Sequence, residues 1–242
     1  MVVILQNKEK FVEILDRYEP SGEARQIIAT MPLVTLQGIS GAGRNTIIDY
    51  MTASGKYHTI VSDTTRPPKV RDGALEQNGV QYFFRSEEQV LADLEKGLFL
   101  EAELIHDQQV SGISIRELKR AHESGKIPIN EVALEGCRNI ELAKPDTIFC
   151  FVVPPSYDTW ISRITDREVM SEAELANRIT SAQKEIEEAL GTERFHFVVN
   201  DTIENAAAWI DAIVDGQVPK KSDEVGRKLA EKLLQDIRAH HA

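Results

Sequence analysis

The feature that most constrains this chain is a glycine-rich turn that joins a short apolar segment to a helix-forming segment. The turn runs from Gly38 to Gly43 with the sequence GISGAG, after the apolar residues 33–37 and before a predicted helix at 44–53. Glycines let successive backbone N–H groups turn inward around an anion, and the start of a helix adds its dipole. This context predicts a phosphate-binding loop, although a strand-to-helix turn without a ligand can carry the same glycines.

The rest of the chain alternates short apolar segments with helix-length segments. The short segments are rich in β-branched and aromatic residues, which is typical of buried strands. Alternation at this spacing predicts an α/β fold with a mostly parallel sheet covered by helices on both faces. Further strands are predicted at 58–62, 80–84, 98–104, 127–134, 147–153 and 195–199, and further helices at 86–96, 114–125, 156–166, 171–190 and 201–214.

The composition argues against several classes of protein. The 242 residues carry a formal net charge of −11, whereas a general nucleic-acid binder needs a basic face for phosphate backbones. No apolar run approaches the ~20 residues of a membrane helix. Cys137 and Cys150 have neither a metal-site spacing nor a disulfide framework, and they are typical of core thiols in a reducing compartment. We therefore expect a cytoplasmic protein with small-molecule ligands, without nucleic-acid or membrane partners.

An amphipathic pattern occurs near each end of the chain. We expect two helices that pack on the domain surface, and a helix that binds a protein partner or a second copy is the alternative. The apolar positions are Phe11, Ile14, Leu15 and Tyr18 in the first, and Val225, Leu229, Leu233 and Ile237 in the second.

Six further features follow one another along the chain. They are SDTTRPPK at 62–69, EQNGVQYFF at 76–84, FLE at 99–101, FVVPPS at 151–156, three arginines (Arg163, Arg167 and Arg178) and VND at 199–201. In this order and spacing, residues 33 to 213 resemble the guanylate kinase family. The resemblance implies a P-loop NTPase-type domain at 32–215, with an NMP-binding region at 62–124 and a lid region at 156–190. It leaves an N-terminal helical extension at 1–31 and a C-terminal amphipathic helix at 216–242.

The resemblance also implies two nucleotide sites and a set of catalytic cations. ATP would bind to Gly38, Ser40, Gly41, Ala42, Gly43, Arg44, Asn45, Thr46 and Asn200. GMP would bind to Ser62, Arg66, Lys69, Tyr82, Glu101, Ser114 and Glu131. The catalytic cations would be Arg44, Arg163, Arg167 and Arg178. These residue types suit the chemistry, because cations stabilise the dispersed charge of a phosphoryl group in transfer, and a carboxylate such as Glu101 can accept both N–H donors of guanine.

Several positions depart from the family pattern. The loop carries Arg44 and Asn45 where lysine and a hydroxyl residue are usual, and the forked arginine is not equivalent to a compact lysine. Asn45 would offer Mg²⁺ a carbonyl oxygen instead of a hydroxyl, with Thr46 as an alternative ligand. Lys69 replaces an arginine, the segment 110–114 lacks a tyrosine, and Ala133 replaces a second acidic residue.

Three hypotheses about function follow. The leading one is an ATP- and Mg²⁺-dependent kinase that phosphorylates GMP or dGMP. The altered loop favours a second, a non-catalytic guanylate-kinase-like module that binds a nucleotide or a protein. A third is a kinase for another phosphorylated small molecule. The retained arginines favour the first, because a module that binds only proteins has little need of a cationic clamp.

Overall fold

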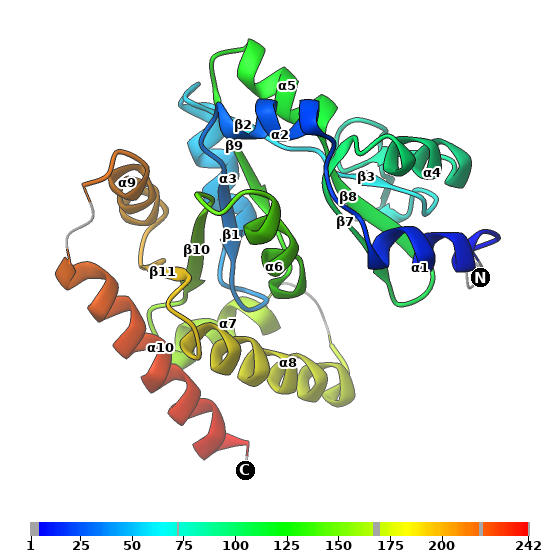
Figure 1. Cartoon of the computed structure of the whole chain (residues 1–242). Helices are drawn as coiled ribbons and strands as arrows, with labels where there is room; N and C mark the ends of the chain where they lie inside the picture. Colours follow the sequence, from blue (N-terminus) through cyan, green and yellow to red (C-terminus); the bar gives the residue numbers. More distant parts are fainter. Residues whose placement is uncertain (1–4, 72, 167–169, 218–219, 242) are drawn as a thin grey trace. The chain divides into compact units, whose positions relative to one another are not determined.

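The computed structural model describes residues 5–71, 73–166, 170–217 and 220–241, and its elements fall into two compact units (Figure 1). Unit 1 comprises the described residues of Met1–Leu33, His58–Pro128 and Glu135–Thr147. Unit 2 comprises those of Val34–Tyr57, Ile129–Leu134 and Ile148–Ala242. Each unit is therefore assembled from three separate stretches of chain.

The central sheet has the strand order β11-β10-β1-β9-β2. Strand β1 (Val34–Gln37), all of it buried, pairs in parallel with β10 (Ile148–Val153) and with β9 (Ile127–Glu131). Strand β10 pairs in parallel with β11 (Phe195–Val199), and β2 (Tyr57–Thr59) forms an edge. The prediction of an α/β fold around a parallel sheet is confirmed.

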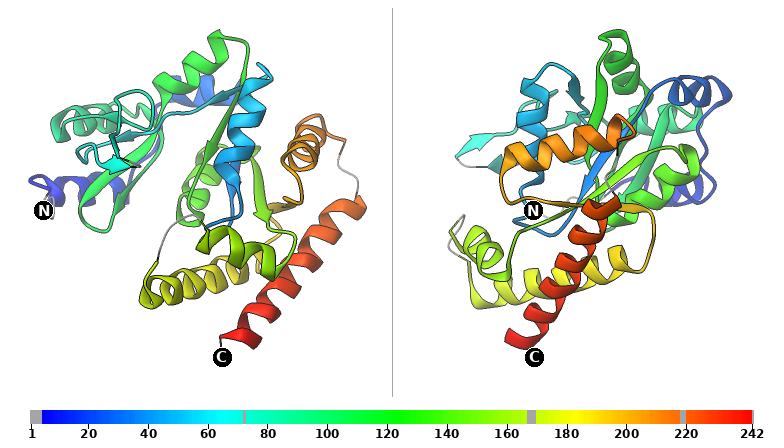
Figure 2. Two further views of the ribbon diagram at one scale, coloured as in Figure 1. Left: turned by 180° about the vertical axis from the view of Figure 1, so that it is seen from behind. Right: turned by 90° about the vertical axis from the view of Figure 1, so that its left-hand side faces the viewer.

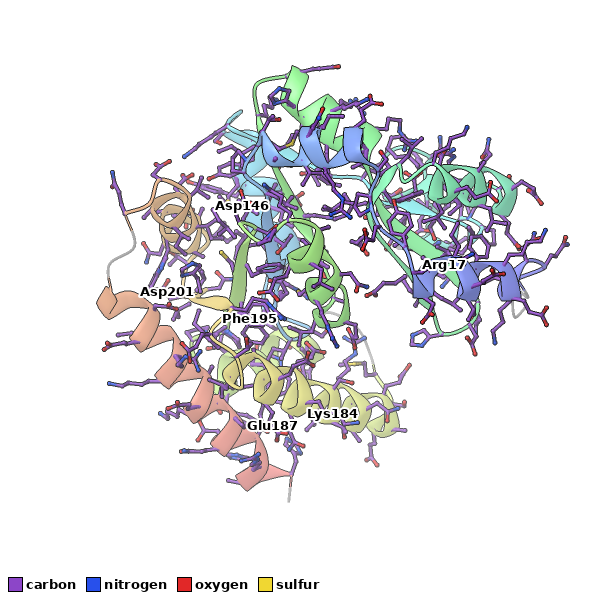
Figure 3. The ribbon with its side chains drawn as sticks, viewed as in Figure 1. Arg17, Asp146, Lys184, Glu187, Phe195 and Asp201 are labelled. Atoms are coloured by element: carbon purple, nitrogen blue, oxygen red, sulfur yellow. The ribbon has the colours of Figure 1, made fainter. Side chains whose placement is uncertain are left out.

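The helices of unit 2 follow the predicted positions within two residues. They are α3 (Arg44–Ala53), α7 (Tyr157–Thr165), α8 (Glu172–Leu190) and α9 (Ile203–Val214), and α10 (Lys220–His240) follows them. Helix α9 packs against α3, while α10 runs along β11 and α8 (Figure 2). Phe195 of β11 lies among core side chains, where its ring makes edge-type contacts with the rings of Phe149 and Phe151 (Figure 3). On the surface, Glu187 of α8 forms an ion pair with Arg238 of α10 at 2.6 Å.

The predicted apolar face of the C-terminal helix is confirmed in its second half. Leu233 and Ile237 are buried, because this face of α10 lies on β11 and α8. Val225 is 56% exposed, so its assignment to the apolar face is wrong. Among the described residues, no helix is both long and apolar enough to cross a membrane.

Unit 1 contains a second sheet with the order β6-β3-β8-β7. Strands β7 (Phe99–Ile105) and β8 (Gln109–Ser114) form an antiparallel hairpin. Strand β3 (Asp63–Thr64) pairs antiparallel with β8 and parallel with β6 (Phe83–Phe84). A small hairpin, β4 (Val70–Arg71) with β5 (Ala74–Leu75), completes the strands described in this unit. Sequence patterns missed β8, because its residues QVSGIS combine polar side chains with a glycine.

The helices of unit 1 include two that the sequence did not predict. Helices α4 (Glu87–Glu95) and α5 (Ile115–Glu123) lie where expected, whereas α2 (Gly22–Ala29) and α6 (Leu134–Ala143), which begins at the unit boundary, were missed. Helix α1 (Lys8–Asp16) packs against α4 and β7 and buries Phe11 completely. It ends two residues before Tyr18, so the placement of Tyr18 on this helix is wrong.

Candidate functional site

The glycine-rich turn connects β1 to α3 in unit 2, as predicted. Gly38, Gly41 and Gly43 have φ angles of +139°, +83° and +94°, which side-chain-bearing residues rarely adopt. A Cβ atom on Gly43 would lie 2.3 Å from Nδ2 of Asn200, so this position requires glycine. The loop leads directly into the ten-residue helix α3. Backbone amides at the start of a helix form a favourable site for an anion.

Two side chains from other elements hold this loop through its carbonyl groups. Asn200, after β11, donates from Nδ2 to the carbonyl of Ala42 at 2.7 Å. Trp160 of α7 donates from Nε1 to the carbonyl of Ser40 at 2.8 Å. Because these carbonyls are already engaged, an anion approaching the loop meets fewer free acceptor oxygens. Trp160 was not predicted as a site residue, since an apolar helix position gives no sign of such a contact.

Arg44, at the first position of α3, forms an ion pair with Glu131 at the end of β9. Its Nη2 lies 2.9 Å from Oε1 of Glu131, and the two side chains are 20% and 34% exposed. The sequence assigned Arg44 to the ATP site and Glu131 to the GMP site, whereas the structure brings them together in unit 2. A guanidinium has five N–H donors, so one bond to Glu131 leaves other donors for a phosphate.

Arg163 of α7 lies beside the residue that fixes the loop. Its Nη2 donates to the carbonyl of Asn200 at 3.2 Å. Its Nη1 is buried and has no hydrogen-bond partner in the described part of the chain, and the same holds for Oδ1 of Asn200. The unpaired Nη1 is a donor and would suit an acceptor such as a phosphate oxygen, whereas the unpaired Oδ1 of Asn200 would suit a donor.

The structure gives fewer contacts for the other predicted lid and loop residues. Arg178 lies on α8, within the segment 172–190, and has an interaction partner of its own. Arg167 lies outside the described residues, so its predicted role is untested. Asn45 and Thr46 lie in the first turn of α3, and both are exposed.

In unit 1, the residues predicted to hold an acceptor phosphate gather around Glu76. Arg66 donates from Nη1 and Nη2 to the carboxylate of Glu76, at 2.5 Å and 3.0 Å, and both side chains are buried. The backbone N–H of Lys69 donates to the same carboxylate at 2.9 Å. The guanidinium carbon of Arg66 lies 4.7 Å from the ring centroid of Tyr82. Glu76 begins the segment 76–84 and is not one of the predicted site residues, yet its carboxylate holds Arg66 in place.

The β7–β8 hairpin carries the residues predicted to recognise the base. Glu101 is buried, and its Oε1 accepts a hydrogen bond from the N–H of Ile113 at 3.1 Å. Burial, reinforced by the negative charge of Glu103, raises the pKa of Glu101 to about 8. The hydroxyl of Ser114 is buried and has no partner among the described residues. Ser62 lies between β2 and β3 and accepts from the N–H of Phe83 through its carbonyl at 2.9 Å.

Comparison with known proteins gives one consistent family. A family profile described as guanylate kinase matches residues 30–217. A guanylate kinase of Clostridioides difficile is 31% identical over 191 residues, covering 78% of this chain and 90% of the relative. A guanylate kinase of Corynebacterium diphtheriae is 33% identical over 187 residues, covering 76% and 95%. The crystal structure of guanylate kinase from Anaplasma phagocytophilum matches with a TM-score of 0.53, over 77% of this chain and 86% of that chain. At 20% sequence identity, this match shows a similar fold.

Proposed function

The chain belongs to the guanylate kinase family, and we propose that it transfers the γ-phosphoryl group of ATP to the phosphate of GMP or dGMP. The observation that carries this proposal is the loop from Gly38 to Gly43, whose three positive-φ glycines lead directly into α3, with Arg163 held nearby through the carbonyl of Asn200. The carbonyls of Ser40 and Ala42 are already engaged by Trp160 and Asn200, so the arrangement favours an anion at the loop.

The donor site consists of the loop from Gly38 to Thr46 together with Asn200. The loop amides would bind the phosphate oxygens, and Arg44 would contact the terminal phosphates while Glu131 holds it from the other side. An arginine can do both because its planar fork presents separate N–H groups to two acceptors.

Magnesium would sit at the start of α3. Asn45 and Thr46 are exposed there, and their oxygen atoms are the ligand type that this ion prefers. Among the described residues, no group of three or more histidine, cysteine, aspartate or glutamate side chains could hold a metal. The ion would therefore take most of its ligands from phosphate and water, and when bound it neutralises phosphate charge.

The acceptor site would use two parts of unit 1. Arg66, Lys69 and Tyr82 would bind the phosphate of GMP, with Glu76 fixing the orientation of Arg66. Glu101 as a carboxylate would accept the N1–H and N2–H of guanine, and the unpartnered Ser114 hydroxyl would add a polar contact.

In the transfer itself, a phosphate oxygen of GMP forms a bond to the γ-phosphorus as the bond to the β–γ bridging oxygen breaks, and ADP leaves. The transition state is loose and its negative charge is dispersed, so the main task of the protein is to position the reactants and to stabilise charge. Arg44, Arg163, Arg167 and Arg178 are proposed to supply that positive charge.

We also propose that the enzyme acts in the cytoplasm, which the two buried free thiols, Cys137 and Cys150, support. Contact with a protein partner or a second copy through the terminal helices stays a prediction.

A coupled assay of ADP release with GMP, dGMP, AMP and ribose phosphates tests the proposal. GMP should exceed AMP by roughly tenfold to a hundredfold in kcat/KM, because adenine has an acceptor at N1 and would leave Glu101 without a donor, a loss of about 1–3 kcal/mol. An equal or reversed preference would overturn the guanine assignment. As a control, Glu101→Gln should weaken GMP far more than ATP.

A further inference from the structure

The N-terminal extension, defined here as residues 5–29, lies outside the family match at 30–217 but belongs to unit 1. Helix α1 shares a hydrophobic cluster with α4 and β7, in which Phe11 and Phe99 are fully buried. The carboxylate of Glu87, at the start of α4, accepts from the backbone N–H groups of Gln6 and Asn7 at 3.0 Å and 2.8 Å. The first residues of the extension are therefore bound to unit 1 by hydrogen bonds.

A second contact of the extension is made by Tyr18, which follows α1. The Tyr18 hydroxyl donates to the carbonyl of Phe99 at 2.8 Å and accepts from the N–H of the same residue at 2.7 Å. Burial raises the pKa of Tyr18 to about 12, so the hydroxyl keeps the proton that it donates. Strand β7 lies at the edge of its sheet. Tyr18 therefore satisfies both outward-facing backbone groups of Phe99, as a neighbouring strand would.

This contact falls where the register of the β7–β8 hairpin shifts. Phe99 pairs with Ser114, whereas Glu101 pairs with Ile113, and the irregularity lies between Phe99 and Glu101. Such bulges redirect the side chains beside them. The register determines that the N–H of Ile113 meets Oε1 of Glu101. A side chain that fixes Phe99 therefore also fixes the direction of Glu101.

After Tyr18, the chain passes close to the residues that immediately precede β7. The N–H of Ser21 donates to the carbonyl of Gly97 at 3.0 Å. A Cβ atom on Gly97, which has a φ of +64°, would lie 2.4 Å from the backbone nitrogen of Ser21. The close approach of the two backbones thus depends on glycine at position 97.

The extension also borders the space beside Glu101. A cavity of about 240 Å³ in unit 1 is bordered by Tyr18, Pro20 and Arg25 of the extension and by Glu101 of β7. Glu101 thus shares one cavity with five residues that the family match does not include, namely Leu15, Tyr18, Glu19, Pro20 and Arg25.

From these contacts, we propose that Tyr18 is a positioning residue for the acceptor site, through which the extension holds the bulged start of β7 and so orients Glu101 toward guanine. The proposal rests on the proposed function of Glu101 as the guanine acceptor. Tyr18 acts through the backbone of Phe99 and does not itself touch the nucleotide.

The test compares Tyr18→Phe with Tyr57→Phe by calorimetric titration of GMP and of MgATP. Tyr57 is a matched control, because it is a buried tyrosine whose hydroxyl bonds Asp211 in unit 2. Tyr18→Phe should raise the Kd of GMP about fivefold, the size of one hydrogen bond, and leave the Kd of MgATP unchanged. Tyr57→Phe should change neither. If Tyr18→Phe does not fold, Glu87→Gln, which loosens the start of α1, should weaken GMP selectively in its place.

Adding Glu101→Gln separates this inference from the proposed function. In a Glu101→Gln background, Tyr18→Phe should cause no further loss of GMP affinity, since there is no carboxylate left to orient. If Glu101→Gln weakens GMP but neither Tyr18→Phe nor Glu87→Gln does, the positioning inference is wrong and the proposed function stands. If Glu101→Gln leaves GMP affinity unchanged, the guanine assignment fails first. Equal losses for both nucleotides would reduce Tyr18 to a structural contact and overturn the inference.

Discussion

Replacing Arg44 by lysine, the residue usual in such loops, should lower activity. Arg44 holds Glu131 at 2.9 Å, and both side chains are largely shielded, at 20% and 34% exposed. A hydrogen bond between charged groups is worth about 1.5–3 kcal/mol, and partial exposure reduces this to about 1 kcal/mol. A lysine brings all its N–H donors to one point, whereas the planar fork of arginine presents separate N–H groups to Glu131 and to the phosphates. We therefore expect Arg44→Lys to reduce kcat/KM for ATP about fivefold, and Arg44→Lys with Asn45→Ser to remain below the wild type.

The assay is steady-state ADP release at saturating GMP with varied ATP, run as a double-mutant cycle with Glu131→Gln. The cycle should return a coupling of about 1 kcal/mol between positions 44 and 131, so that Arg44→Lys costs less once Glu131 is neutral. A tenfold rise in turnover for Arg44→Lys would refute the reasoning, because it would mean that the site is still shaped for lysine. Strictly additive effects would likewise show that the ion pair has no part in catalysis.

Three further predictions concern single side chains. Because the pKa of Glu101 is raised to about 8, its carboxyl is protonated at lower pH. The GMP affinity measured by calorimetry should therefore fall as pH drops from 8.5 to 6.5, whereas the GMP affinity of Glu101→Gln should not change over this range. Arg163→Ala should lower kcat roughly 10²-fold with little change in the Kd of ATP, and an unchanged kcat would remove Arg163 from the catalytic set. Glu76→Gln should lower the free energy of unfolding, measured in urea, by about 3–5 kcal/mol, because it leaves Arg66 as a buried charge without its partner. Glu13→Gln, in an exposed ion pair, should lower it by under ~0.5 kcal/mol, and equal losses for the two variants would contradict this.

The parts of the fold that follow from local sequence were predictable. Helix α3 begins at Arg44, one residue after the glycine loop, and the apolar strands β10 and β11 lie where their β-branched residues indicate. Helix α1 was extended too far because Tyr18 continues its apolar pattern. Pro20 offered the missing signal, since the residue before a proline avoids helical geometry and Glu19 therefore favours a break.

The contacts that build the site depend on residues far apart in the chain. Arg44 and Glu131 meet because β1 and β9 are paired, so that the start of α3 and the end of β9 lie at the same edge of the sheet. Periodicity describes one segment at a time and does not reveal such a pairing. The hold of Tyr18 on Phe99 has the same cause, because it depends on β7 being an edge strand.

Direct identification of the products tests the central claim most simply. The full chain would be incubated with MgATP and GMP, and the nucleotides separated by anion-exchange chromatography, with Arg163→Ala as the control. The account predicts ADP and GDP in equal amounts, formed together by the wild type and about 10²-fold more slowly by Arg163→Ala. ADP without GDP would indicate hydrolysis, and the absence of both products would contradict phosphoryl transfer to GMP.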